Sequence, residues 1–254
     1  MNKPEHLSSN AANFEKDNDN VFGRIANKYD FLCDVFSFGI HRLWKRKVAD
    51  LIYERDWETL LDVASGTGAI AIRTVRHKKN TKDHHIIVSD INPKMLERAE
   101  EKLSHYGKNI TFRIIDAHAM PEVADNSVDV YSIAFGLKIC DREKVLSEAF
   151  RVLRPSGMLV ILESSKIPWK LIQTSYFAYM RIVMPFIGWA ASGGDRSAYK
   201  YLLKGIRNFP DAEGLASEIE GYKFSNVSFK RLSLGIVAIH QATKPPQSSQ
   251  DTHH

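Results

Sequence analysis

Short apolar runs alternate with longer amphipathic segments from Thr59 to Gly157, and no other feature of this sequence restricts the fold as strongly. Such alternation is typical of βαβ units, in which helices connect parallel strands of one sheet. The apolar runs predict five buried strands, Thr59–Ala64, His85–Ser89, Ile110–Ile115, Val128–Ala134 and Met158–Leu162. The amphipathic segments predict three helices, Ala69–Arg76, Pro93–His105 and Arg142–Leu153, with a turn at Arg154–Gly157 after the last.

The pattern changes near the C-terminus, where two strand-like runs follow each other directly. Phe224–Lys230 and Gly235–Gln241 are separated only by Arg231–Leu234, which is too short for a crossover helix. We therefore expect these strands to pair as an antiparallel hairpin. A mostly parallel, seven-stranded α/β sheet that ends in such a hairpin is the Rossmann-like fold of class I methyltransferases, which bind S-adenosylmethionine.

Polar segments at both ends bound a single predicted domain. Residues 1–20 and 244–254 are dominated by polar residues, and we expect both to be disordered. The body, residues 21–243, is then one methyltransferase domain with a helical insertion at about 165–208. Cys33 and Cys140 are the chain's two cysteines, and no Cys/His cluster has metal-ligand spacing. We therefore expect no metal site and a reducing, cytoplasmic environment.

A turn of small residues follows the first predicted strand. The segment Asp62–Gly68 reads DVASGTG, and its glycines let the backbone approach a ligand at the N-terminus of the next helix. Asp90 and Asp116 stand at the ends of the second and third strands, where a carboxylate can accept ribose hydroxyl hydrogens. Together these residues predict a nucleoside site at the carboxyl ends of parallel strands.

The same turn also fits a different ligand class, because Gly66–Ala71 satisfies the G-x-G-x-x-A dinucleotide fingerprint. Asp62 distinguishes the two classes. A carboxylate before the glycines repels a pyrophosphate but attracts the sulfonium and ammonium groups of S-adenosylmethionine. We therefore favour S-adenosylmethionine as the cofactor over a dinucleotide.

The sequence resembles the family of quinone C-methyltransferases that act in ubiquinone and menaquinone biosynthesis. The resemblance covers residues 21–243, and its most specific parts are the N-terminal block and the late Tyr-x-Tyr-Leu block. The residues that carry it are Val21–Arg46, Asp62–Gly68, Asp90-Ile91-Asn92 with Met95, Asp116-Ala117, Phe135-Gly136-Leu137, Arg151–Gly157, Asp195–Leu202, Ile206-Arg207 and Phe209-Pro210.

The resemblance implies methylation of a ring carbon of a demethyl quinol, either a menaquinol or a ubiquinol precursor. It also implies that Thr67 and the neighbouring glycines hold the methionine portion of the donor, Asp90 the ribose, and Asp116 with Ala117 the adenine. The full set of expected cofactor-binding residues is Tyr29, Asp62, Gly66, Thr67, Gly68, Asp90, Ile91, Met95, Asp116, Ala117 and Ala134.

Two departures from the family pattern lie near the expected acceptor. Ala134 replaces a common serine, and Lys138-Ile139 replaces an Arg-Asn pair, with one residue fewer before the next helix. Two alternatives therefore stay open: a relative recruited to a secondary metabolite or to another use of S-adenosylmethionine, and a non-catalytic binding subunit. If the reaction is quinol methylation, the Lys138 ammonium lowers the pKa of an acceptor phenol beside it. Because the Arg-Asn pair is absent, catalysis then depends more on Tyr199 or Asp195. We therefore expect Lys138, Tyr199 and Asp195 to be the catalytic residues.

The apolar segment Ile167–Ala191 is rich in aromatic residues and methionine but is interrupted by Lys170, Arg181 and Pro185, so we expect it not to span a membrane. It predicts an apolar acceptor pocket and peripheral contact with the inner membrane face, where a prenylated quinol resides. The net charge is +5, but the basic residues form no cluster beyond Arg42–Lys47. We therefore expect no nucleic-acid partner. A homodimer and a quinone-biosynthesis complex are both compatible with the sequence.

Overall fold

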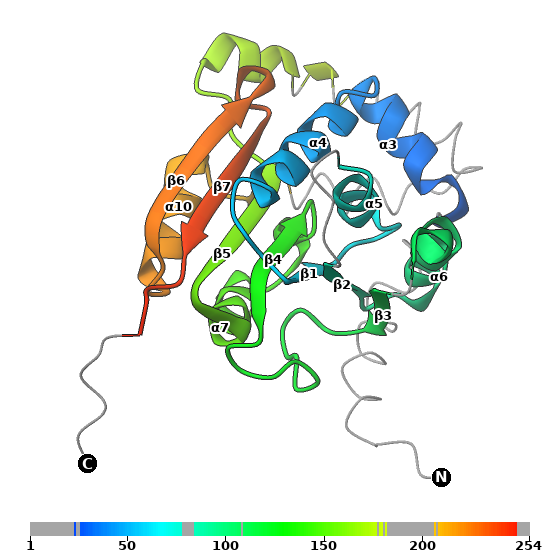
Figure 1. The fold of residues 1–254 in the computed structure, drawn as a ribbon. Coiled ribbons are helices and arrows are strands. Elements are labelled where there is room, and N and C mark those ends of the chain that lie inside the picture. Colours follow the sequence, from blue (N-terminus) through cyan, green and yellow to red (C-terminus); the bar gives the residue numbers. More distant parts are fainter. Residues whose placement is uncertain are drawn as a thin grey trace.

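The structure, a computed structural model, describes residues 23, 26–77, 84–107, 109–176, 178–179, 181, 206 and 208–247. Within them, seven strands form one sheet in the order β3-β2-β1-β4-β5-β7-β6 (Figure 1). Neighbours from β3 to β5 are parallel, and β7 is antiparallel to β5 and β6. The predicted fold is therefore confirmed. The strands are β1 Thr59–Val63, β2 His85–Asp90, β3 Ile110–Ile114, β4 Val128–Ala134, β5 Leu153–Ser164, β6 Ser225–Leu232 and β7 Val237–Thr243.

Helices cover both faces of the sheet, with α4, α5 and α6 on one face and α7 and α10 on the other (Figure 1). Successive strand residues point to opposite faces, so Leu60 joins the core cluster of Trp44 from α4, whereas Leu61 joins that of Leu146 from α7. The described helices are α3 Tyr29–Ser37, α4 His41–Ile52, α5 Ala69–Val75, α6 Pro93–Leu103, α7 Arg142–Val152 and α10 Ala212–Gly221, with 3-10 turns η1 Ala26–Lys28, η2 Ser104–Tyr106, η3 Leu137–Ile139 and η4 Ser233–Gly235.

The start of β5 differs from the prediction. The expected turn at Arg154–Gly157 is wrong, because β5 begins at Leu153 directly after α7. The β4–β5 pairing shifts register between Val128 and Val130, and Ser156 has a φ of +66°. A β-bulge therefore accommodates Pro155, which has no N–H to donate to a regular ladder.

The ordered body also extends past its predicted C-terminal end. Lys244 was assigned to the tail, yet its N–H donates to the Gly157 carbonyl and its own carbonyl accepts from the Ser156 N–H, both at 2.9 Å. Its ammonium donates to the Phe150 carbonyl at 2.7 Å. Backbone pairing of this kind does not require an apolar side chain, so the hydrophobic pattern could not reveal it.

Part of the predicted insertion and both predicted disordered ends lie outside the described residues. Residues 170–176 are helical, whereas residues 182–205, which include Asp195 and Tyr199, are not described. The same holds for residues 1–22 and 248–254. No helix in the described part of the chain is long and apolar enough to cross a membrane.

Candidate functional site

A pocket lies at the carboxyl ends of β1, β2, β3 and β4, where the sequence predicted a nucleoside site. We call it the glycine-turn pocket. Its described lining contains two carboxylates and no lysine or arginine. The lining residues are Tyr29, Ala64, Gly66, Asp90, Ile91, Asn92, Met95, Ile115, Asp116, Ala117, His118, Ala134, Phe135, Gly136, Ile139 and Cys140. A negatively charged lining suits a cationic nucleoside and opposes a pyrophosphate.

The two glycines of the turn have different functions. Both lie in the left-handed region, with φ of +57° at Gly66 and +72° at Gly68. A Cβ on Gly68 would lie 2.8 Å from the Leu103 side chain of α6, so this glycine permits close packing of the turn against α6. A Cβ on Gly66 would approach only Tyr29, at 3.8 Å. Gly66, not Gly68, leaves backbone accessible to a ligand in the pocket.

Asp90 connects the turn to the start of α6. Its Oδ2 accepts the Gly66 N–H and its Oδ1 accepts the Asn92 N–H, each at 2.8 Å. Asn92 in turn caps α6 by accepting from Lys94 and Met95 backbone N–H groups. Burial raises the pKa of Asp90 to about 6, although the two backbone N–H groups favour its ionised form. Each oxygen keeps a second lone pair for a ligand hydroxyl.

His118, which sequence reasoning missed, fixes the orientation of Asp116. The Asp116 Oδ1 accepts from the His118 backbone N–H at 2.9 Å and from its ring Nδ1 at 2.7 Å. The ring Nε2 accepts the Asp141 N–H at 2.9 Å, so Nδ1 carries the proton. Burial opposes ionisation of Asp116, but the His118 hydrogen bonds outweigh it and lower the pKa of this carboxyl. The sequence signal for this contact is that His118 follows Asp116 by two positions, because an aspartate side chain commonly accepts the backbone N–H two residues on.

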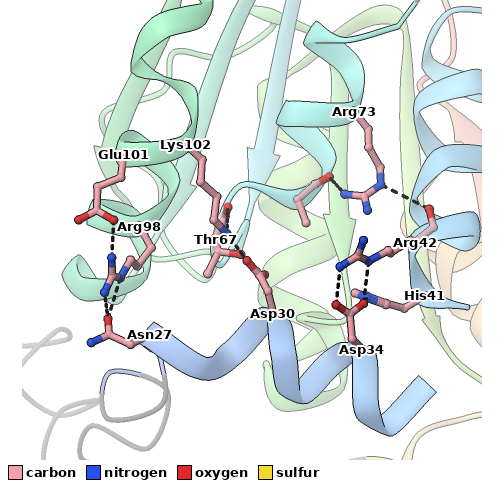
Figure 2. A network of polar contacts seen from close by, with 11 residues as sticks. Asn27, Asp30, Asp34, His41, Arg42, Thr67, Arg73, Arg98, Glu101 and Lys102 are labelled. Atoms are coloured by element: carbon pink, nitrogen blue, oxygen red, sulfur yellow. Dashed lines mark hydrogen bonds and ion pairs between the residues drawn. The ribbon is translucent and has the colours of Figure 1, made fainter. Parts of the chain in front are cut away.

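Polar contacts attach α3 to the turn, and this helix buries only Leu32. Asp30 accepts the Thr67 hydroxyl at 2.6 Å and also pairs with Lys102 of α6 (Figure 2). Thr67, which we expected at the methionine portion of the donor, therefore uses its hydroxyl to hold α3. Figure 2 also shows Asn27 of η1 bonded to Arg98 of α6, and Asp34 of α3 bonded to His41 and Arg42 of α4.

Asp62 is fully buried beneath the turn and does not line the pocket. Its Oδ1 accepts the Ser132 hydroxyl at 2.7 Å, and its Oδ2 has no hydrogen-bond partner among the described residues. Burial raises the pKa of Asp62 to about 7. The Ser132 hydroxyl, the Ala71 backbone N–H and Lys45 favour the ionised form of Asp62 but do not outweigh burial, so a cationic ligand nearby would stabilise this carboxylate further.

Lys138 lies in the protein interior rather than in an open site. Its Nζ pairs with Glu163 Oε1 at 3.0 Å, with side chains 3% and 1% exposed, and it also donates to the Phe135 carbonyl. Phe135 has a φ of +61° and lines the pocket, so the ion pair supports a strained pocket wall. The catalytic assignments of Lys138, Asp195 and Tyr199 stay predictions, and the burial of Lys138 favours a supporting role for it over contact with the acceptor.

A larger hollow of about 740 Å³ is lined in part by Asp30 and Thr67. Its lining includes five cationic side chains and three carboxylates, and it lacks both Asp90 and Asp116. It also contains none of the strand ends that form a nucleoside site in this fold. The glycine-turn pocket therefore remains the candidate cofactor site.

The family model of the ubiE/COQ5 methyltransferases matches residues 10–244. This chain belongs to that family. It is 40% identical over 227 residues to the ubiquinone/menaquinone biosynthesis C-methyltransferase UbiE of Roseobacter denitrificans, covering 88% of this chain and 89% of that protein. The UbiE of Acidiphilium cryptum is 41% identical over 225 residues, covering 87% of each chain.

Solved structures show the same fold at low sequence identity. A methyltransferase from Thermotoga maritima aligns with a TM-score of 0.62 at 14% identity, over 88% of this chain and 99% of that one. The C-methyltransferase domain of citrinin polyketide synthase aligns with a TM-score of 0.58, also at 14% identity, over 80% and 53%.

Family membership makes this chain a methyltransferase, and S-adenosylmethionine is its cofactor. The pocket lining is chemically compatible with this molecule, because its two carboxylates, Asp90 and Asp116, can accept hydroxyl and amino hydrogens. The dinucleotide interpretation is not favoured. Neither the secondary-metabolite nor the non-catalytic alternative gains support from the relatives.

Proposed function

We propose that this enzyme methylates a ring carbon of a demethyl quinol in ubiquinone or menaquinone biosynthesis. The main support for this proposal is the glycine-turn pocket, which has Asp90 and Asp116 at neighbouring strand ends and no lysine or arginine in its described lining. The chain that forms this pocket is 40% identical to a UbiE protein. S-adenosylmethionine, when bound, supplies an electrophilic methyl group on its sulfonium. The protein binds and orients the two reactants and keeps water from them.

The proposed binding roles follow from lone pairs that the protein leaves free. Asp90 receives the ribose hydroxyls, since its hydrogen bonds to Gly66 and Asn92 use one lone pair of each oxygen. Asp116 offers Oδ2 to the adenine amino group because His118 occupies Oδ1. Met95 and Ala117 provide apolar contacts in the pocket lining. Lys138 acts as a positioning residue that supports Phe135 through its carbonyl.

The acceptor's identity is tested by deleting the gene and measuring the extracted quinones by mass spectrometry. We expect the mature quinone to disappear and a precursor lighter by one methylene unit to accumulate. Re-expression of the wild-type gene should restore the quinone, whereas an Asp90→Ala variant should restore less of it. Normal quinone in the deletion strain, with no second methyltransferase present, would contradict the proposal.

We also propose peripheral membrane contact, because exposed apolar side chains gather around the α3–α4 turn and the start of the insertion. Phe38 is 74% and Leu171 81% exposed. The Phe38 and Tyr179 rings lie 6.1 Å apart, which joins the two regions. An apolar surface of this kind favours a bilayer that holds the prenylated acceptor.

Flotation with anionic liposomes tests this contact. Phe38→Ser with Leu171→Ser should reduce the lipid-bound fraction several-fold, and Ile114→Ser, at an exposed apolar position on the edge strand β3, should not. Equal flotation of all three proteins would contradict the membrane proposal without affecting the methyltransferase assignment.

A further inference from the structure

Within the described part of the chain, Lys45 of α4 is a buried lysine without a counter-ion. Its residue exposure is 6%, and none of the described residues gives its Nζ a hydrogen bond or an ion pair. Other lysines near the pocket are paired, Lys138 with Glu163 and Lys102 with Asp30. In contrast, no described residue accepts a hydrogen from the Lys45 ammonium group.

The surroundings of Lys45 place it next to the cofactor pocket. Its Nζ lies 5.9 Å from the centroid of the Phe135 ring, which lines the glycine-turn pocket. Lys138 Nζ lies 5.2 Å from the same ring. Burial, which is the largest cause, lowers the pKa of Lys45, and Arg73 lowers it further, whereas Cys33, Asp30 and Asp62 raise it. The two carboxylates therefore act on Lys45 from a distance, without bonding to it.

This arrangement is unfavourable in the absence of a ligand. An ammonium group removed from water loses its hydration, and a single aromatic ring compensates only part of that loss. A buried charge is normally paired, and an unpaired one near a pocket indicates a partner that arrives from outside the protein. The partner must be a hydrogen-bond acceptor, because an ammonium group has donors only, and an anionic oxygen is the acceptor that best compensates a buried positive charge.

We propose that the Lys45 ammonium binds an anionic oxygen of a ligand in or beside the glycine-turn pocket. This rests on the proposed function, which supplies two such oxygens: the α-carboxylate of the methyl donor and the ring oxygen of an ionised quinol. Both sources share the same chemistry, an oxygen anion that accepts a charge-assisted hydrogen bond.

The test compares Lys45→Met with Lys47→Met, which removes an exposed lysine of the same helix. Calorimetry measures S-adenosylhomocysteine, which has the α-carboxylate, and 5′-methylthioadenosine, which lacks the amino-acid portion. If the carboxylate is the partner, Lys45→Met weakens the first ligand at least about tenfold and leaves the second unchanged. Lys47→Met should bind both ligands as the wild type does.

If the acceptor oxygen is the partner, both ligands bind Lys45→Met normally, but kcat with a short-chain demethyl quinol falls at least about tenfold and its pH profile changes. Lys45→Arg should restore part of either loss because it keeps the charge. Thermal denaturation without ligand supplies a folding control, in which Lys45→Met should be at least as stable as the wild type.

Unchanged S-adenosylhomocysteine affinity together with unchanged kcat in Lys45→Met would overturn the proposal. A variant that loses stability and binds both ligands equally weakly would also overturn it, since Lys45 would then be structural. If the wild type transfers no methyl group to a quinol, the proposed function fails, and the calorimetry alone then tests whether Lys45 binds the carboxylate of the donor. Unchanged S-adenosylhomocysteine affinity then overturns the role of Lys45 as well.

Discussion

Replacing Asp62 by asparagine should stabilise the ligand-free enzyme at alkaline pH. Asp62 is fully buried, and its Oδ2 lacks a partner among the described residues. Burial raises its pKa from an ordinary 3.8 to about 7, so the folded state holds this proton more tightly than the unfolded state. The free energy of unfolding therefore falls as pH rises from about 4 to about 7 and then levels off.

The size of this loss follows from the two pKa values. A rise from 3.8 to about 7 corresponds to at most about 4 kcal/mol of unfolding free energy. Asparagine is neutral at every pH and keeps an oxygen for the Ser132 hydroxyl, so Asp62→Asn avoids the loss. Asp90, whose pKa burial raises to about 6, adds a smaller loss of the same sign in both proteins.

Urea denaturation of the ligand-free proteins at about pH 5 and about pH 8 measures this effect. The wild type should lose about 1 to 2.5 kcal/mol more stability than Asp62→Asn between the two pH values, because part of the total loss already occurs below pH 5. The same variant should bind S-adenosylmethionine more weakly, because a neutral amide attracts its cationic end less than a carboxylate does. Parallel stability changes in the two proteins would refute the reasoning.

Three further changes test other parts of the site. Asp90→Ala should weaken S-adenosylhomocysteine binding by about 1 to 3 kcal/mol in calorimetry, and unchanged affinity would exclude the ribose role. Gly68→Ala should lower urea-measured stability by about 1 to 3 kcal/mol, and by more than Gly39→Ala, since both have positive φ but only Gly68 lacks room for a Cβ. Lys138→Met should cost about 3 to 5 kcal/mol by leaving the Glu163 carboxylate buried and unpaired, whereas Lys138→Met with Glu163→Gln should regain much of that stability. Equal urea curves for the single and double variants would show that the unpaired Glu163 carboxylate is not the cause of the lost stability.

The sheet was predictable because its signals are local. A strand buried on both faces is apolar at nearly every position, and Val128–Ala134 was predicted at the bounds that β4 has. The C-terminal hairpin followed from the short interval between two apolar runs. The bulge at Pro155 was not predictable in this way, because an Arg-Pro-Ser-Gly segment also fits a turn after a helix.

The pairings around the site depend on contacts between distant segments. Lys138 and Glu163 are 25 positions apart, and Asp30 and Thr67 are 37 apart, so no local pattern indicates either contact. Lys45 did have a local signal. It shares the buried face of α4 with Trp44, Val48 and Ile52 at helical spacing, although its charge suggested a solvated position.

Transfer of an isotopically labelled methyl group from S-adenosylmethionine to a short-chain demethyl quinol tests the central claim most directly. The product is located by NMR, and S-adenosylhomocysteine is quantified in the same reaction. We expect the label on a ring carbon, with one S-adenosylhomocysteine formed per methyl group transferred. Label on a quinol oxygen, or no transfer by an enzyme that binds the donor, would contradict this claim.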